Sequence, residues 1–308
     1  MSAAFRIGLT YGGVPRDGEG AVEHLMAFAQ QAEASGFSSL WLSNDFSWDP
    51  ITTAALLVGV TRRIELGSAV APIFSRHPVV MAQEALSISA VSQGRFSLGI
   101  GLSHKMIVEE VLGLSYERPH QQMAEYLSVL VPLLGREANR FIGEMYRVSV
   151  DLWVPGTDTV PLMMAASDEQ MFCHVGRYAT GLLTWLAGAK GLRTHVMPHL
   201  RQAAEQAERA TPRVIVGLPI VITDDVTRGR EAVDRRYGLQ GQMPSHEATL
   251  EREGAHRVSD VALIGSEDQV LERLHGLAEL GMTDFNAAIV EADGESIGRT
   301  LEFLTSHL

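Results

Sequence analysis

The 308-residue chain contains one cysteine, Cys173, so it cannot form an internal disulfide. A lone free thiol is typical of a reducing compartment, and we expect a cytoplasmic location. At the N-terminus no basic segment precedes an apolar one, and no apolar run approaches the length that crosses a bilayer. The sequence therefore predicts neither a signal peptide nor a membrane span.

Positive charge is also scarce. The formal net charge is −12, with 25 Lys and Arg against 37 Asp and Glu, and no basic block offsets the excess. This balance argues against nucleic acid and against an anionic membrane surface as partners. Hydrophobic residues make up 46 % of the chain, an ordinary share for a globular protein with a large core.

Several common catalytic motifs are missing. The chain has no Gly-x-Gly-x-x-Gly, no P-loop and no Gly-x-Ser-x-Gly. His195 and His199 have the i, i+4 spacing of a zinc protease, but Pro198 lies between them and no Glu follows His195, so we expect surface histidines. Cys173 and His174 would lie on different faces of a helix, which argues against an activated thiolate. No metal site is predicted.

The segment Arg63–His104 carries the clearest positive signal. A β-branched run, Ile64–Val70, is followed by a Pro-containing loop, by a helical apolar pattern over Val79–Val91 and by a second strand, Phe96–Ile100. Strand, helix and strand within about forty residues form the βαβ unit of a parallel sheet. Parallel α/β enzymes place their chemistry where strands end, so the ends of these two strands become candidate sites.

The same alternation continues along the whole chain. The predicted strands are Phe5–Tyr11, Ser39–Ser43, Ile64–Val70, Phe96–Ile100, Leu162–Ala166, Gly181–Leu186, Val214–Ile222 and Phe285–Val290. The predicted helices are Gly20–Ala34, Asp49–Val60, Pro78–Val91, Pro119–Leu134, Asp168–Tyr178, Lys190–Glu208, Thr227–Tyr237, Glu267–Leu280 and Ser296–Ser306. Eight strands alternating with helices favour a (β/α)8 TIM barrel, one α/β domain over residues 1–308, with an open doubly wound sheet as the alternative.

Two stretches interrupt this rhythm. Gly135–Pro161 is too long for a simple loop, and its sequence around Gly143 predicts a small hairpin. Gly238–Asp260 is polar and helix-prone. We interpret both as insertions in the barrel, and insertions of this length are often functional covers over a site.

The first candidate site is Gly99–His104, at the end of a predicted strand. Two glycines separated by one residue let backbone N–H groups approach an anion, although they also suit a tight turn. His104 would then lie at the carboxyl end of the barrel, where it could exchange a proton. A helix-capping or surface histidine is the equally weighted alternative.

The second candidate follows the predicted strand Ser39–Ser43. Asn44 and Asp45 stand beside two aromatic residues and suit a ligand-facing lip, whereas Asp49 before Pro50 predicts a helix cap. The third is Ser68–Pro72, where small residues would let a flat ring lie against the backbone, although ordinary strand packing is the more frequent reason for such a run.

The fourth candidate is Ala165–Asp168, where a strand of small residues opens a helix. Ser167 is predicted to be the N-cap, and N–H groups at that helix start could hold a phosphate. The negative charge of Asp168 would repel such an anion.

Together these segments resemble the bacterial luciferase-like monooxygenase superfamily over nearly the whole chain. The stretches that carry the resemblance are Gly36–Trp41, Arg63–Val70, Arg76–Val80, Ser92–Phe96 with Leu98–Gly101, and Ile264–Ser266. Gly101-Leu102-Ser103-His104, followed by Leu114–Tyr116 and Pro119, is most similar to the branch that uses the deazaflavin coenzyme F420 in place of FMN.

The resemblance implies a luciferase-like barrel with insertions, usually a homodimer, that holds a flavin-type ring at the carboxyl ends of its strands. It implies a non-prolyl cis peptide at Ala69–Val70, behind the ring. It places Ser103 and His104 near the phosphate side and the ring, and Asn44 and Asp45 near the reactive face. The cofactor-binding residues it implies are Asn44, Ser68, Ala69, Val70, Gly101, Leu102, Ser103, Ala166 and Ser167.

The expected function is hydride transfer between coenzyme F420 and a small organic substrate. His104 would be the acid/base, since its ordinary pKa is near 6.5, and Asp45 would orient the substrate. One alternative is an FMNH2-dependent monooxygenase, and another is a non-catalytic flavin-binding relative. A metal-dependent barrel hydrolase is disfavoured, because no cluster of histidines and carboxylates stands at the strand ends.

Overall fold

Eight parallel strands close into a barrel in the computed structural model, which describes residues 5–12, 20–157 and 159–308. In ring order the strands are β1 (Arg6–Tyr11), β2 (Ser39–Leu42), β3 (Glu65–Ser68), β5 (Phe96–Gly101), β8 (Leu162–Ala165), β9 (Gly181–Trp185), β10 (Arg213–Ile222) and β12 (Asp284–Ile289). β12 pairs with β1 and completes the ring. The predicted (β/α)8 TIM barrel is confirmed, and the open-sheet alternative is wrong.

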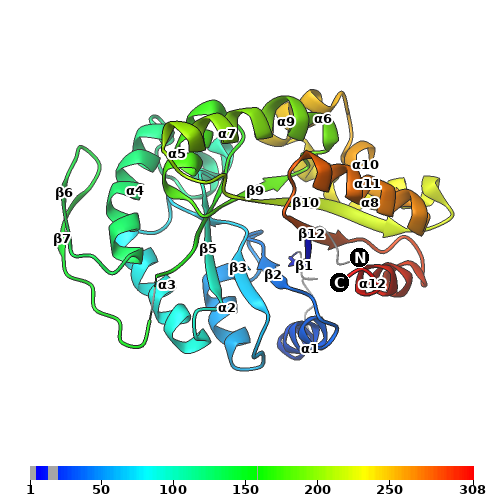
Figure 1. Ribbon diagram of the computed structural model, residues 1–308, viewed down its shortest axis with the longest axis horizontal. Coiled ribbons are helices and arrows are strands. Elements are labelled where there is room, and N and C mark those ends of the chain that lie inside the picture. The colour runs from blue at the N-terminus through cyan, green and yellow to red at the C-terminus, as the bar shows by residue number, and fades with distance from the viewer. Residues whose placement is uncertain (1–4, 13–19, 158) are drawn as a thin grey trace.

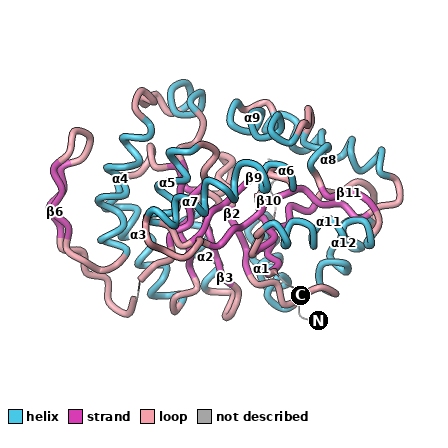
Figure 2. Tube along the Cα trace, turned by 45° about the horizontal axis from the view of Figure 1, so that its top comes forward, coloured by secondary structure: helices cyan, strands magenta, loops and turns pink. Residues whose placement is uncertain are grey.

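Helices surround this ring of strands (Figure 1; Figure 2). They are α1 (Ala21–Ala34), α2 (Pro50–Val58), α3 (Pro78–Ser92), α4 (Pro119–Leu134), α5 (Glu169–Tyr178), α6 (Ala189–Gly191), α7 (Met197–Gln206), α8 (Val226–Gly241), α11 (Glu267–Leu280) and α12 (Ser296–Thr305). Local chemistry fixes where some helices begin and end. Asp49 caps α2, as predicted, by accepting from the N–H of Thr52 at 2.8 Å. Gly281 ends α11 with a left-handed backbone, φ 117°. No helix in the described part of the chain is long and apolar enough to cross a membrane.

The two long stretches contain regular structure of their own. Apart from residue 158, which lies outside the described residues, Gly135–Pro161 forms the predicted hairpin from β6 (Asn139–Ile142) and β7 (Arg147–Val150), and this hairpin projects from the body (Figure 1). Gly238–Asp260 contains the end of α8, then α9 (Pro244–Glu253) and α10 (Val258–Val261).

Short elements differ from the prediction. A strand that was not expected, β11 (Leu263–Gly265), pairs with the end of β10, and another, β4 (Ala71–Pro72), pairs with β5. Two π-helical turns, η1 (Ile107–Val111) and η2 (Leu192–Val196), were also not expected. Strands of two or three residues are too short for a detectable period, which is why the pattern did not reveal them.

The amino end of the barrel is closed by an ion-pair network. The Arg213 guanidinium donates to Glu65 at 3.1 Å and to Asp284 at 2.7 Å, and Arg6 donates to Glu65 at 2.6 Å. Each of these residues is the first of its strand. Burial alone would raise the pKa of Glu65, but the adjacent Arg213 and its hydrogen bonds lower the pKa below its usual value. Glu65 is therefore held in its charged form.

Large side chains fill the barrel interior above this network. Trp41, Met163, Leu183 and Ile215 pack together there. Gly67 makes room for Trp41, because a Cβ at position 67 would stand 2.3 Å from the indole ring. The interior is thus a packed core, and a cavity opens at the carboxyl ends of the strands.

Candidate functional site

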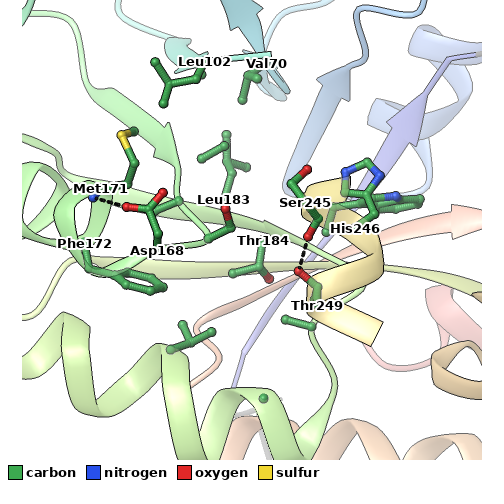
Figure 3. A pocket seen from close by; sticks show the side chains of 18 of the residues that line it. Val70, Leu102, Asp168, Met171, Phe172, Leu183, Thr184, Ser245, His246 and Thr249 are labelled. Atoms are coloured by element: carbon green, nitrogen blue, oxygen red, sulfur yellow. Dashed lines mark hydrogen bonds between the residues drawn. The ribbon is translucent and has the colours of Figure 1, made fainter. Parts of the chain in front are cut away.

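A cavity of about 230 Å³ lies at the carboxyl ends of β5, β8 and β9, beneath α9 (Figure 3). The side chains labelled there come from strand ends, from the start of α5 and from the yellow helix α9. Residues lining the cavity include Val70, Gly101, Leu102, Ser103, His104, Tyr116, Ala165, Ala166, Ser167, Asp168, Leu183, Thr184, Trp185, His195, Ser245, His246, Thr249 and Arg252. This is the end of a TIM barrel where active sites are found.

One wall comes from the ends of β3 and β5. The peptide bond Ala69–Val70 is cis, as the resemblance implied. A Cβ at Gly101 would approach Val70 Cγ2 to 2.7 Å, so glycine leaves the surface of Val70 open to the cavity. Ser68 is fully buried, and its hydroxyl bonds both the carbonyl and the N–H of Gly99, at 2.8 and 2.9 Å. Ser68 therefore ties the two strands together behind the wall and does not line the cavity.

His104 lines the cavity from the loop after β5. Ser103 turns this loop with a left-handed backbone, φ 60°. Burial lowers the pKa of His104, so the imidazole is neutral at pH 7. Its Nδ1 lies 3.2 Å from the hydroxyl oxygen of Ser245, and its ring meets that of His246 edge to face, with centroids 4.9 Å apart.

His246 is held still more firmly in the neutral form. Burial is the main cause that lowers its pKa to about 4, and neighbouring His104 lowers it further, against a hydrogen bond to the Gln240 carbonyl that raises it. Because a carbonyl oxygen only accepts, Nδ1 of His246 carries the proton in the 2.8 Å bond to Gln240.

The predicted phosphate site at the end of β8 needs a correction. The N-cap of α5 is Asp168, which accepts from the N–H of Met171 at 3.0 Å (Figure 3), and not Ser167. The Ser167 carbonyl is instead bonded to Nε2 of His195 at 3.2 Å. Ser167 and Ala166 do line the cavity, but a carboxylate already occupies the helix start.

The expectation for His195 was wrong. It is half-buried and lines the cavity, although it was predicted to be a surface residue. His199 bonds the His195 carbonyl at 2.6 Å and Glu169 at 3.2 Å. Pro198 stands in the first turn of α7, directly after the π-helical turn η2, so its missing N–H falls where the helix changes its hydrogen-bond pattern.

Asn44 and Asp45 are not among the residues that line the cavity. Asn44 is exposed, and the Asp45 carboxylate accepts from the backbone N–H of Ser47 at 3.2 Å. Burial raises the pKa of Tyr237, and the negative charge of Asp45 raises it further, so Asp45 lies near this ring. Tyr237 in turn packs edge to face against Trp185 of the cavity, at 5.3 Å. These two aromatic rings thus connect Asp45 to the cavity lining.

Gly238–Asp260 was expected to be a cover over a site, and its helix α9 does line the cavity, although the individual residues were not predicted. Ser245, Thr249 and Arg252 line the cavity from one face of this helix, with the i, i+4, i+7 spacing that could have indicated it. Glu253 anchors the other end of α9, because its carboxylate accepts from the N–H groups of Gly188 and Gly191, each at 2.7 Å. The polar insertion is therefore part of the site.

No group of three or more histidines, cysteines and carboxylates among the described residues is placed to hold a metal ion. The cavity offers backbone groups, neutral histidines and apolar surface, together with Arg252 and Asp168 as its charged side chains. This lining suits a large, mostly apolar ring that is positioned by a few polar contacts.

Comparison with known proteins places this geometry in context. The family model described as luciferase-like monooxygenase matches residues 5–284. An F420-dependent hydroxymycolic acid dehydrogenase of Mycobacterium tuberculosis is 28 % identical over 227 residues, which cover 68 % of this chain and only 62 % of that relative. A 5,10-methylenetetrahydromethanopterin reductase of Methanolobus tindarius is 24 % identical over 281 residues, 91 % of this chain and 78 % of the relative.

Solved structures show the same fold. An F420-dependent secondary alcohol dehydrogenase in complex with an F420-acetone adduct has a TM-score of 0.80 at 16 % identity, and the match covers 100 % of this chain and 98 % of that one. The oxygenating constituent of 3,6-diketocamphane monooxygenase from Pseudomonas putida, in complex with FMN, has a TM-score of 0.78 at 17 % identity, with 98 % and 96 % covered.

Proposed function

Since this chain belongs to the luciferase-like monooxygenase family, we propose that it is an oxidoreductase that transfers a hydride between coenzyme F420 and a small organic substrate. The observation that carries the proposal is the cavity wall of Val70 and Gly101, at the place where the family resemblance implies a flavin-type ring. The names of the relatives favour F420 over FMN, because several of them are F420-dependent dehydrogenases.

The residues present fit a tricyclic ring. Val70, Leu102 and Leu183 supply apolar surface, and Gly101 keeps that surface flat. Ser103, Ala166 and Ser167 offer polar groups on the side where the phosphate would lie. When bound there, the deazaflavin supplies or accepts a hydride, while the protein contributes orientation and the proton.

His104 is the residue we assign to the proton. Hydride transfer at a carbon that bears oxygen develops or removes negative charge on that oxygen, and a neighbouring imidazole can compensate for it. Replacement of His104 by glutamine should lower turnover by about a hundredfold, the usual contribution of a general acid or base, with F420 affinity unchanged.

Asp45 remains the proposed orienting residue for the substrate, with weaker support. Its carboxylate lies near Tyr237, and Tyr237 packs against Trp185 of the cavity, so Asp45→Asn should change KM more than kcat. An equal fall in kcat and kcat/KM would instead assign Asp45 a role in the transition state.

Binding of both coenzymes tests the proposal directly. F420 and FMN are titrated separately against the purified protein, and fluorescence quenching reports each affinity. We expect F420 to bind more tightly, and its absorbance to change on turnover with a panel of alcohols and carbonyl compounds. Binding of FMN alone, with oxygen consumed, would establish the monooxygenase alternative. Binding without turnover over the whole panel would indicate a non-catalytic relative.

The homodimer and the cytoplasmic location stay predictions. Leu56 on α2 and Val80 and Val91 on the adjacent α3 are large apolar side chains that are exposed in the single chain, and a second copy could cover them. Sedimentation equilibrium of the wild type and of a Leu56→Glu variant tests this assembly. A wild type that remains monomeric at high concentration would contradict it.

A further inference from the structure

The start of α9 is fixed against the cavity at a defined position. His246 donates from Nδ1 to the Gln240 carbonyl at 2.8 Å, which ties this turn to the end of α8. At the far end, the Glu253 carboxylate holds Gly188 and Gly191 at 2.7 Å each. Ser245 stands in the first turn, directly before His246, and Figure 3 shows it together with His246 and Thr249 on α9 beside the cavity.

Ser245 has one side-chain hydrogen bond within the described part of the chain, and its partner is Nδ1 of His104 at 3.2 Å. The hydroxyl proton has no other acceptor among the described residues. Nδ1 of a neutral imidazole accepts this proton only when the imidazole proton is on Nε2. Nε2 makes no hydrogen bond to a described residue, and His104 lines the cavity.

We propose that Ser245 is a positioning residue: its hydroxyl donates a hydrogen bond to Nδ1 of His104 and keeps the proton of the neutral imidazole on Nε2. From there the N–H can donate a hydrogen bond to a carbonyl oxygen in the cavity. This deepens the proposed function and rests on it for the identity of the reaction. It assigns the substrate oxygen a chemical class, a hydrogen-bond acceptor such as a ketone or enone carbonyl, on which negative charge grows as the carbon is reduced.

The tautomer can be measured without cofactor or substrate. In ¹⁵N-labelled protein at pH 8, the two imidazole nitrogens of His104 are distinguished by NMR, and the signals absent from a His104→Gln variant assign them. We expect one tautomer, with the proton on Nε2. In Ser245→Ala the ratio should shift by about fivefold to tenfold toward the Nδ1-protonated form, the effect of losing one neutral hydrogen bond.

Two further variants keep the interpretation sharp. Ser245→Thr retains the hydroxyl and should restore the wild-type tautomer. Glu247→Ala lies in the same turn of α9, is exposed, and should leave the His104 signals unchanged. A wild-type imidazole protonated on Nδ1, or a Ser245→Ala spectrum identical to wild type, would overturn the proposal.

Coenzyme binding distinguishes a failure of the proposed function from a failure of the role assigned to Ser245. If F420 fails to quench the fluorescence of the protein while His104 shows the Nε2-protonated tautomer, the proposed function fails and the role of Ser245 stands. If F420 binds equally well to the wild type and to Ser245→Ala while His104 of the wild type is protonated on Nδ1, only the role of Ser245 is lost.

Discussion

The two ends of the barrel differ in the charge state of their titratable side chains. At the amino end, Arg213 is paired with Glu65 and Asp284, and the pKa of Glu65 is lowered, so charge is stabilised. At the carboxyl end, burial lowers the pKa of His104 and His246, so charge is removed. The first arrangement contributes to folding, and the second leaves side chains able to exchange protons or to bind a ligand.

Unpaired polar atoms show the same contrast. Within the described residues, the indole nitrogen of Trp185 and the amide oxygen of Asn286 are buried without a hydrogen-bond partner, and the two strands that carry them both pair with Gly217 of β10. Each such atom loses its hydration without compensation. Both groups lie on strands of the barrel that neighbour β10.

The largest effect is expected from breaking the amino end. Arg213→Ala leaves Glu65 and Asp284 buried without their shared cation, and should lower the free energy of unfolding by about 3–5 kcal/mol. Urea denaturation measures it. The control is Arg299→Ala, which removes the more exposed pairs to Glu267 and Asp224 and should cost about 1 kcal/mol or less. Equal losses in the two variants would contradict the contrast.

Acid should weaken the carboxyl end through His246. Its native pKa is about 4, below the ordinary value of about 6.5, so the unfolded chain binds a proton in this window and the native protein does not. The free energy of unfolding should therefore fall as pH drops from 6.5 toward 4, by about 3 kcal/mol for this group. His246→Asn should flatten that slope in urea denaturation. A slope unchanged by the substitution would show that His246 does not control it.

Filling the wall of the cavity should produce a smaller effect. Gly101→Ala forces Val70 aside and should cost about 1–3 kcal/mol of stability. F420 affinity should fall by about tenfold, or 1.4 kcal/mol. Gly276→Ala in α11, where a Cβ would meet nothing within 4 Å, is the matched control and should stabilise the protein slightly. If Gly101→Ala binds F420 normally, the ring does not lie on this wall.

The smallest effect concerns the charge at the start of α5. Asp168→Ser keeps a good N-cap, so stability should change by only about 0.5 kcal/mol or less. Removing the carboxylate beside Ser167 should strengthen F420 binding about twofold to fivefold, if the phosphate lies there. Titration at two salt concentrations measures it, because an electrostatic gain is reduced by salt. Weaker binding would place the phosphate elsewhere.

The barrel could be predicted because each strand run is bounded by residues with a clear local role. Asp49 with Pro50 starts α2, Gly281 ends α11, and the buried strands between them are continuous apolar runs. Ser167 and Asp168 show the limit of this reasoning. Both are good N-caps in adjacent positions, and only the path of the chain decides which of them reaches the N–H of Met171.

The site was predictable only where it is local. Val70, Gly101 and His104 follow strand ends, and the family resemblance marked them. Ser245 is 141 positions from His104. Its helical spacing with Thr249 and Arg252 marks one face of α9, but the spacing does not say what that face contacts. Long-range contacts of this kind depend on how the insertion packs against the barrel. The periodicity of a single helix carries no information about that packing.

The Glu253 carboxylate has a consequence for how ligands enter. It accepts from the N–H groups of Gly188, Lys190 and Gly191, so displacing α9 would strip three donors of their acceptor at once. A route that swings this helix outward is therefore costly. Ligands are therefore expected to enter and leave the cavity while α9 stays in place.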